Sequence, residues 1–252
     1  MRRTLRGIAK LTFVQIKLLL REPPAMFFTL IFPSILLVFF GSVFGNDVDP
    51  DAFVKFGYAD GQIAAFTALI IGTTALMGIP IATATKREHG VLRRYRATPL
   101  HPASYLAADV ITNYLITLQG MVVLVILGKL LFHLRFGGTW AGVLAGFTLA
   151  SLSFFSAGYV IASLAPTGRT AQVAGQLLFF PMMFLSGAAI PLHMMPEGMR
   201  KVSEFLPLTH VVNLLRGLWF GEPWGDHVSQ VIVLGVMLVV GVAVSAKVFR
   251  WE

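Results

Sequence analysis

Six long apolar runs divide the 252-residue sequence and constrain its fold more than any other feature. A helix that crosses a bilayer needs roughly 20 mostly apolar residues, and each run reaches about that length. The runs cover residues 24–45, 60–85, 105–132, 140–164, 170–190 and 228–248. Composition agrees, because 56% of the residues are hydrophobic and 13% are charged, whereas soluble domains carry roughly 25% charged residues. The sequence therefore predicts an all-α polytopic membrane protein with six transmembrane helices in a single domain, residues 1–252.

Lysine and arginine are distributed unevenly between the two sides of a membrane that these six segments would define. Fourteen of the 20 fall on the side of the chain ends and of residues 86–104, and six fall on the other side together with eight acidic residues. Short loops rich in Lys and Arg stay in the cytoplasm. We therefore expect both termini and residues 86–104 to be cytoplasmic. Topology then accounts for the net charge of +8 without a nucleic-acid partner.

Residues 1–22 have the pattern of an amphipathic helix. If this segment is helical, its basic residues fall within an arc of about 100°. They are Arg2, Arg3, Arg6, Lys10, Lys17 and Arg21. Such a helix lies in the membrane interface with its basic face against anionic lipid headgroups. The alternative is a solvated, disordered basic tail.

The segment 191–226 is too apolar for a free loop and too interrupted for a membrane span. It predicts two short helices, about 196–205 and 209–220, separated by Pro207. These outer, re-entrant helices would dip into the outer leaflet or cap it. Non-helical backbone at such a depth must be covered by protein or water, so the segment is expected to pack on the outer ends of the spans.

The motifs of several enzyme classes are missing from the sequence. It has no GxxxxGK[ST] phosphate-binding loop, no HExxH and no GxSxG. It also has no cysteine, which excludes thiolate metal sites and cysteine nucleophiles. We expect neither a metal site nor a catalytic residue, and so no enzymatic activity of the chain alone.

The loop at 85–100, TKREHGVLRRYRATPL, combines an acid, a glycine, a short basic helix and a Thr-Pro pair. Gly90 can end the helical extension of the preceding span, and residues 91–97 can form two helical turns. Charge alone does not separate this pattern from an ordinary basic loop that stops membrane insertion.

This loop resembles the one between the second and third spans of type-2 ATP-binding-cassette (ABC) exporter permeases. A second pattern also resembles that family: FLSGAAIP at 184–191, followed by PLTH at 207–210 and by Arg216. The resemblance extends over essentially the whole chain. It is nearest to the daunorubicin-resistance-type membrane subunits, with lipid-linked glycan exporters as close relatives.

The resemblance implies that two permease chains pair, as a homodimer or close heterodimer, and that separate ATPase subunits dock from the cytoplasm. ATP and Mg²⁺ would be bound by those subunits, and this chain would hold no cofactor. The implied location is the inner membrane of a bacterium. His210 and Arg216 match the family pattern and are expected to form an outer gate. The residues expected to couple to the ATPase are Glu88, Gly90, Arg93, Arg94 and Arg96.

The fifth apolar run is the best candidate for contact with cargo. Pro181 would kink this helix, and its aromatic and methionine side chains offer adaptable apolar surface. The resemblance implies that cargo passes between the second and fifth spans of the two protomers. The alternative is ordinary packing and lipid contact. The expected cargo residues are Phe66, Thr73, Met77, Gln176, Phe180, Met183 and Phe184.

The predicted function is the membrane subunit of an ATP-driven exporter of amphipathic drugs or lipid-like molecules. A lipid-linked glycan exporter is a close alternative. A secondary transporter working without ATP would need charged residues in the middle of the spans. Only Asp109 is available, and it lies near the cytoplasmic end, where pairing with an arginine of the neighbouring loop is the simpler explanation. A membrane-embedded enzyme is disfavoured, because no nucleophile and base or metal set is recognisable.

Overall fold

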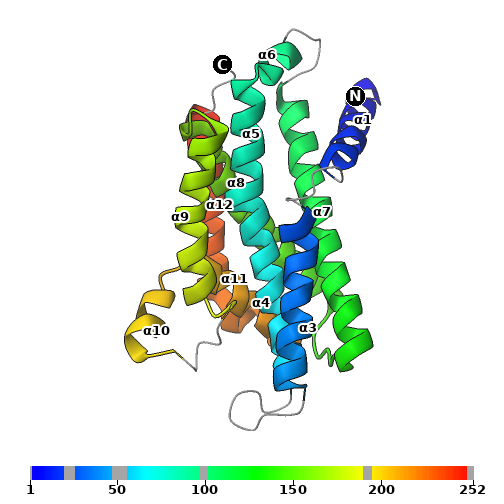
Figure 1. Ribbon diagram of the computed structural model, residues 1–252, viewed down its shortest axis with the longest axis vertical. Coiled ribbons are helices and arrows are strands. Elements are labelled where there is room, and N and C mark those ends of the chain that lie inside the picture. Colours follow the sequence, from blue (N-terminus) through cyan, green and yellow to red (C-terminus); the bar gives the residue numbers. More distant parts are fainter. Residues whose placement is uncertain (1, 20–25, 47–55, 97–101, 190–194, 249–252) are drawn as a thin grey trace.

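The computed structural model describes residues 2–19, 26–46, 56–96, 102–189 and 195–248, and the elements within these ranges are all helices. Most helices run along the long axis of the molecule (Figure 1). The short helix α6 (Val91–Arg96) lies at one end, and α10 (Glu197–Ser203) lies towards the other. We refer to these as the α6 end and the α10 end; both chain termini are at the α6 end (Figure 1).

Among the described residues, four continuous helices are long and apolar enough to cross a membrane. They are Tyr58–Glu88, Ser104–Phe132, Trp140–Leu164 and Trp224–Val248. The first consists of α4 (Tyr58–Thr73), the π-helical turn η2 (Thr74–Gly78) and α5 (Ile79–Glu88). The second belongs to α7 (Pro102–Phe132), the third is α8 (Trp140–Leu164), and the fourth joins η4 (Trp224–His227) to α12 (Val228–Val248).

The other two predicted spans correspond to shorter or less apolar helices. The first apolar run forms η1 (Phe27–Ile31) and α3 (Phe32–Phe44), and the fifth forms α9 (Gly168–Leu185). By length and hydropathy, the described parts of these two runs do not qualify as membrane-crossing helices. Four of the six predicted spans are therefore supported by the length and composition of their helices.

The helix Tyr58–Glu88 occupies the centre of the bundle and is buried along most of its length. It packs against α3, α7, α8, α9 and α11 (Figure 1). Its π-helical turn ends two residues before Pro80, which has no N–H to donate to the carbonyl of Leu76 and so favours a local widening of the helix. A Cβ built on Gly158 of α8 would lie 2.1 Å from the carbonyl oxygen of Ala75, and one on Gly175 of α9 would lie 2.1 Å from that of Leu76. Two glycines thus let the neighbouring helices contact this turn directly.

Helix α11 (Pro207–Phe220) packs on α4, α8 and α12, as predicted for the outer segment. Its buried face includes Leu208, Val211, Leu215 and Trp219. The two short helices predicted for this segment correspond to α10 and α11, but Pro207 is the first residue of α11 and does not lie between the helices. Proline is favourable there, since the first N–H of a helix has no intrahelical partner in any case.

The N-terminal segment forms α1 (Arg2–Leu19), which packs along α7. Thr12 is buried in this contact, and the Thr112 hydroxyl donates to Oε1 of Gln15 over 2.9 Å. Lys10 and Lys17 are exposed on the opposite side. The helix is therefore confirmed for residues 2–19, whereas its placement in a membrane interface stays a prediction.

Candidate functional site

The short helix α6 is mounted on the end of α5 by a tight turn at Gly90. Gly90 has φ +67°, a conformation that favours glycine, and its N–H donates to the Arg87 carbonyl over 2.9 Å. Leu92 is fully buried, whereas Arg93 and Arg94 are exposed. Helix α6 ends at Arg96, whose side chain lies outside the described part of the chain. This segment thus presents two arginines to solvent on an anchored helix.

Glu88 is exposed at the end of α5 but already has a partner within the protein. Its Oε2 accepts a hydrogen bond from the backbone N–H of Gly168 over 3.0 Å, and Gly168 is the first residue of α9. The adjacent guanidinium of Arg87 donates to the carbonyl of Ala165, which follows the last residue of α8. The end of α5 is therefore bonded to the connection between α8 and α9.

Asp109 is buried between α5, α7 and α8. Its Oδ1 lies 3.2 Å from Nζ of Lys86, and its Oδ2 accepts from the Tyr159 hydroxyl over 2.7 Å. The Lys86 amine also lies over the ring of Tyr105, 5.8 Å from its centroid. Pairing at the cytoplasmic end was expected, but the described partner is Lys86 of the preceding span and not an arginine of the loop.

The predicted cargo residues of the second span are largely buried within the chain. Phe66 has no exposed surface, and the Thr73 hydroxyl donates to the carbonyls of Leu69 and Ile70 in its own helix. Met77 is partly exposed. In this conformation a cargo molecule could reach Met77, whereas contact with Phe66 would require its neighbours to move.

On α9, the predicted cargo residues fall into two groups. Phe180 and Phe184 are 44% and 50% exposed, and Gln176 is half-buried. Met183 is buried. Because α9 contacts η2 at Gly175, the structure brings the predicted segments of the second and fifth spans together. A role in cargo contact stays a prediction for all of them.

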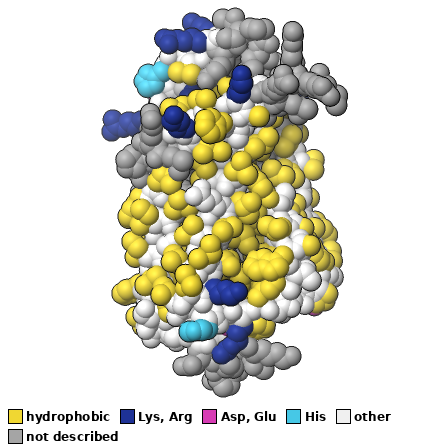
Figure 2. Space-filling model, turned by 90° about the vertical axis from the view of Figure 1, so that its right-hand side faces the viewer, with side chains coloured by type: hydrophobic (Ala, Val, Ile, Leu, Met, Phe, Trp, Pro, Cys, Tyr) yellow, Lys and Arg dark blue, Asp and Glu magenta, His cyan; other side chains and the backbone are white. Residues whose placement is uncertain are grey.

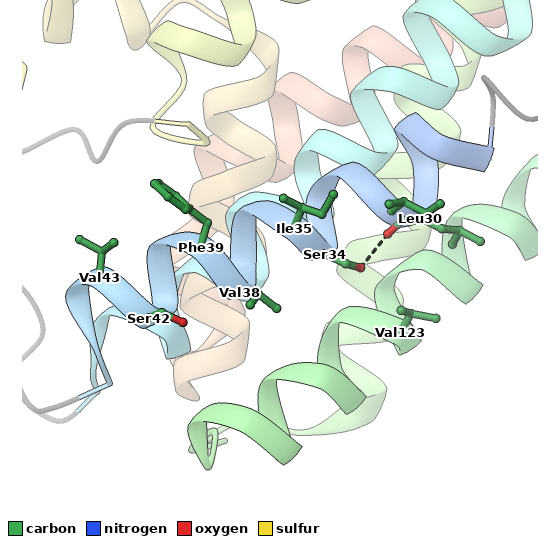
Figure 3. A pocket seen from close by; sticks show the side chains of 9 residues that line it. Leu30, Ser34, Ile35, Val38, Phe39, Ser42, Val43 and Val123 are labelled. Atoms are coloured by element: carbon green, nitrogen blue, oxygen red, sulfur yellow. Dashed lines mark hydrogen bonds between the residues drawn. The ribbon is translucent and has the colours of Figure 1, made fainter.

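A separate apolar groove runs along α3 on the outside of the bundle (Figure 3). It has a volume of about 820 Å³ and is lined by η1, α3 and Val123 of α7. Its polar groups include the hydroxyl of Ser34, which donates to the carbonyl of Leu30 over 2.6 Å and is thus satisfied within its own helix. None of the predicted cargo residues lines this groove.

The two predicted outer-gate residues have different surroundings. His210 is half-buried; burial lowers its pKa below 6.5, and a hydrogen bond with the backbone of Glu204 partly opposes this shift. Arg216 lies near the start of α4, where its Nε donates weakly to the Gly61 carbonyl over 3.5 Å. Burial lowers the pKa of Arg216 to about 10, and the nearby Tyr58 hydroxyl partly offsets this.

Sequence reasoning did not identify Asp60 as a structural centre of the α10 end. This fully buried carboxylate accepts hydrogen bonds from the backbone N–H groups of Gly57 and Arg135, each over 2.8 Å, and from the side chain of Asn46 over 3.1 Å. The sequence does carry one signal for this site, because Asp60 is an acid near the start of an apolar run. A carboxylate buried there needs hydrogen-bond donors around it. The donors themselves are backbone groups that the sequence does not distinguish.

A comparison with known protein families decides the general assignment. The sequence profile of the family described as "ABC-2 type transporter" matches residues 8–220, which is most of the chain. The chain belongs to the ABC-2 type transporter family. As an ABC-2 chain with several membrane-spanning helices, it is a multi-pass membrane protein.

Individual relatives agree with this ABC-2 assignment. Nodulation protein J of Rhizobium leguminosarum bv. viciae is 33% identical over 102 residues, which are 40% of this chain and 39% of that protein. The transport permease YvfS of Bacillus subtilis is 23% identical over 81% of each chain. The daunorubicin resistance ABC transporter permease protein DrrB1 of Streptomyces coeruleorubidus is 23% identical over 82% of this chain and 72% of its own. The match to Nodulation protein J thus covers about two fifths of either protein.

Proposed function

We propose that this chain is the membrane subunit of an ATP-driven exporter that moves amphipathic drugs or lipid-like molecules out of a bacterial cell. Two copies, or this chain and a close relative, would form the pathway, and two separate ATPase subunits would bind ATP and Mg²⁺. Membership in the ABC-2 family supports the transporter assignment. The similarity to a daunorubicin resistance permease favours a drug, and a lipid-linked glycan is the alternative cargo.

The observation that carries this proposal is the anchored helix α6. Leu92 fixes one side of it to the protein, while Arg93 and Arg94 remain free to meet an acidic partner surface. A helix fixed to the end of a central span can move that span as a rigid body when a partner pushes on it. An unanchored basic loop would dissipate such a displacement.

The distribution of charge supports a cytoplasmic α6 end. Figure 2 shows Lys and Arg side chains gathered towards the ends of the molecule, with a broad hydrophobic surface between them. Most of the described basic residues lie at the α6 end, including Lys10, Lys17, Arg93 and Arg94. This orientation follows from the preference of short basic segments for the cytoplasm.

We also propose that η1–α3 and α9 cross the membrane, giving six spans. Helix α9 has 18 residues and would be about 27 Å long at 1.5 Å per residue, close to the roughly 30 Å of a bilayer core. Its exposed apolar side chains, among them Leu177 and Phe184, would face lipid or a second copy. An even number of spans keeps both termini on the side of α6.

The ATP-independent alternative has less support. Ion coupling requires ionisable groups at the depth of the transported ion. In the four long helices that the structure describes, charged residues lie towards the ends and none lies in the middle turns. Asp109, the one acid that the sequence offered for ion coupling, is already paired with Lys86 and accepts a hydrogen bond from Tyr159.

The experiment is reconstitution of the chain in vesicles with and without the ATPase that copurifies with it, using a fluorescent anthracycline as cargo. We expect movement of the dye only with both proteins and ATP.

Arg93→Glu combined with Arg94→Glu should abolish copurification of the ATPase, because both charges that meet it are reversed. The matched control is Arg200→Glu, an exposed arginine at the α10 end. Movement of the dye by this chain alone would contradict the proposal and favour the secondary transporter.

A further inference from the structure

Three consecutive residues at the end of α5 bond to three different neighbouring helices or their ends. Each uses a different chemical group: an amine, a guanidinium and a carboxylate. The three bonds join Lys86 to Asp109 of α7, Arg87 to the Ala165 carbonyl after α8, and Glu88 to the Gly168 N–H of α9. A displacement of the α5 end therefore acts on α7, α8 and α9 together.

The bond from Glu88 is the one that reaches α9. The first N–H groups of a helix have no intrahelical acceptor, and a carboxylate placed there is favoured by the helix dipole. Gly168 brings α9 against α5, because a Cβ on it would lie 2.2 Å from the Thr85 hydroxyl oxygen. The start of α9 is thus held to the end of α5 by one carboxylate across a contact that has no room for a side chain.

Helix α6 is attached at the same place. Only two residues separate Glu88 from the start of α6, and the buried Leu92 holds α6 to the protein. Helix α9 carries the exposed Phe180 and Phe184, which are candidates for cargo contact. The two elements that the proposed transport cycle must connect therefore meet at Glu88.

We propose that Glu88 is a positioning residue that transmits a displacement of α6 to α9 through its bond to Gly168, and that it does not itself bind the ATPase. This inference rests on the proposed function, since it requires an ATPase acting on α6. The arginines of α6 make the contact with that partner, and Glu88 connects the contact to the helix that lines the transport pathway. Its essential property is then a hydrogen-bond acceptor in the right place, and its negative charge is secondary.

The test compares Glu88→Ala with Glu88→Gln in the reconstituted complex. The readout is the coupling ratio, the amount of anthracycline moved per ATP hydrolysed. Glu88→Ala should keep the copurified ATPase and its basal ATP hydrolysis, and its coupling ratio should fall about tenfold because α9 no longer follows α6. Glu88→Gln retains an oxygen that can accept from Gly168, so its ratio should stay within about twofold of the unaltered protein. Glu197→Ala, an exposed acid in α10, is the matched control and should change nothing.

Three other outcomes would overturn the inference, and each identifies a different error. If Glu88→Ala and Glu88→Gln both lose the copurified ATPase, the carboxylate binds the partner directly. If Glu88→Ala keeps a normal coupling ratio, the bond to Gly168 transmits nothing. If the unaltered chain neither binds an ATPase nor needs ATP to move the dye, the proposed function itself is wrong. Lys86 and Arg87 keep their partners in both variants, so the protein is expected to fold, and size-exclusion chromatography verifies this.

Discussion

The two ends of the bundle each hold a buried carboxylate, but with different kinds of donor. At the α10 end, Asp60 accepts from two backbone N–H groups and from the side chain of Asn46. At the α6 end, Asp109 is paired with the amine of Lys86 and the hydroxyl of Tyr159. One carboxylate is thus held mainly by the main chain, and the other mainly by side chains.

This difference indicates which end can change shape. Backbone donors are fixed by the fold, so the bonds of Asp60 break only if the chain path around it changes. Side-chain donors can exchange partners by rotation about their χ angles. The α10 end is therefore built as a fixed cap, whereas the α6 end can rearrange, as a site that receives an ATPase would require.

The largest expected effect comes from Asp60→Asn. The substitution keeps the shape but replaces one acceptor oxygen by an NH₂ group, so at least one of the N–H groups now bonded to Asp60 faces another donor. A buried donor without its acceptor costs about 1–3 kcal/mol, and more where a charge was involved. We expect a loss of about 3 kcal/mol, measured as a lower thermal unfolding midpoint in detergent.

The matched control for Asp60→Asn is Asp226→Asn, an exposed acid in η4 at the same end of the molecule. Its effect should lie within about 0.5 kcal/mol of zero, as for most surface substitutions. Equal unfolding midpoints for the two variants would show that Asp60 does not fix the α10 end.

An intermediate effect is expected from Gly158→Ala, which tests the segment that joins the two ends. The added methyl group would lie 2.1 Å from the Ala75 carbonyl, a backbone atom in the π-helical turn that cannot move without shifting the central helix. Overpacking of this kind costs about 1–3 kcal/mol. Gly235→Ala in α12 is the control, because nothing lies within 4 Å of its Cβ, and it should be neutral or slightly stabilising. A stable Gly158→Ala protein would mean that the central helix is loosely held between the two ends.

Helices with local boundary signals were predictable from the sequence. The span 140–164 matches α8 to the residue: the Thr139 hydroxyl accepts from the Gly142 N–H at its start, and Pro166 follows its end. The glycine between α5 and α6 was also recognisable, because the turn there needs a positive φ. Such signals lie within a few residues of the feature they determine.

The polar contacts were not predictable in the same way. Lys86 and Asp109 are 23 residues apart, and only the packing of α5 on α7 brings them together. Glu88 was expected to face a partner protein, but its acceptor oxygen meets a backbone N–H 80 residues further along the chain. Neither the choice of Lys86 over an arginine nor the bond to α9 has a local pattern. These contacts depend on helix packing, which hydrophobic periodicity does not specify.

The smallest of these destabilisations is expected from Asp109→Asn, the same chemical change at the α6 end. Asparagine keeps a carbonyl oxygen that can accept from the Tyr159 hydroxyl, and its NH₂ group then points towards Lys86. The lysine loses its counter-ion, but its side chain is 33% exposed and lies at the end of a span, so the amine can turn towards water. We expect a loss of about 1 kcal/mol or less, well below that of Asp60→Asn, in the same unfolding assay.

Adding Lys86→Met to Asp109→Asn removes the unpaired amine and should restore most of this loss. If Asp109→Asn instead destabilises the protein as much as Asp60→Asn, the side chains around Asp109 cannot adjust, and both ends of the bundle are equally fixed.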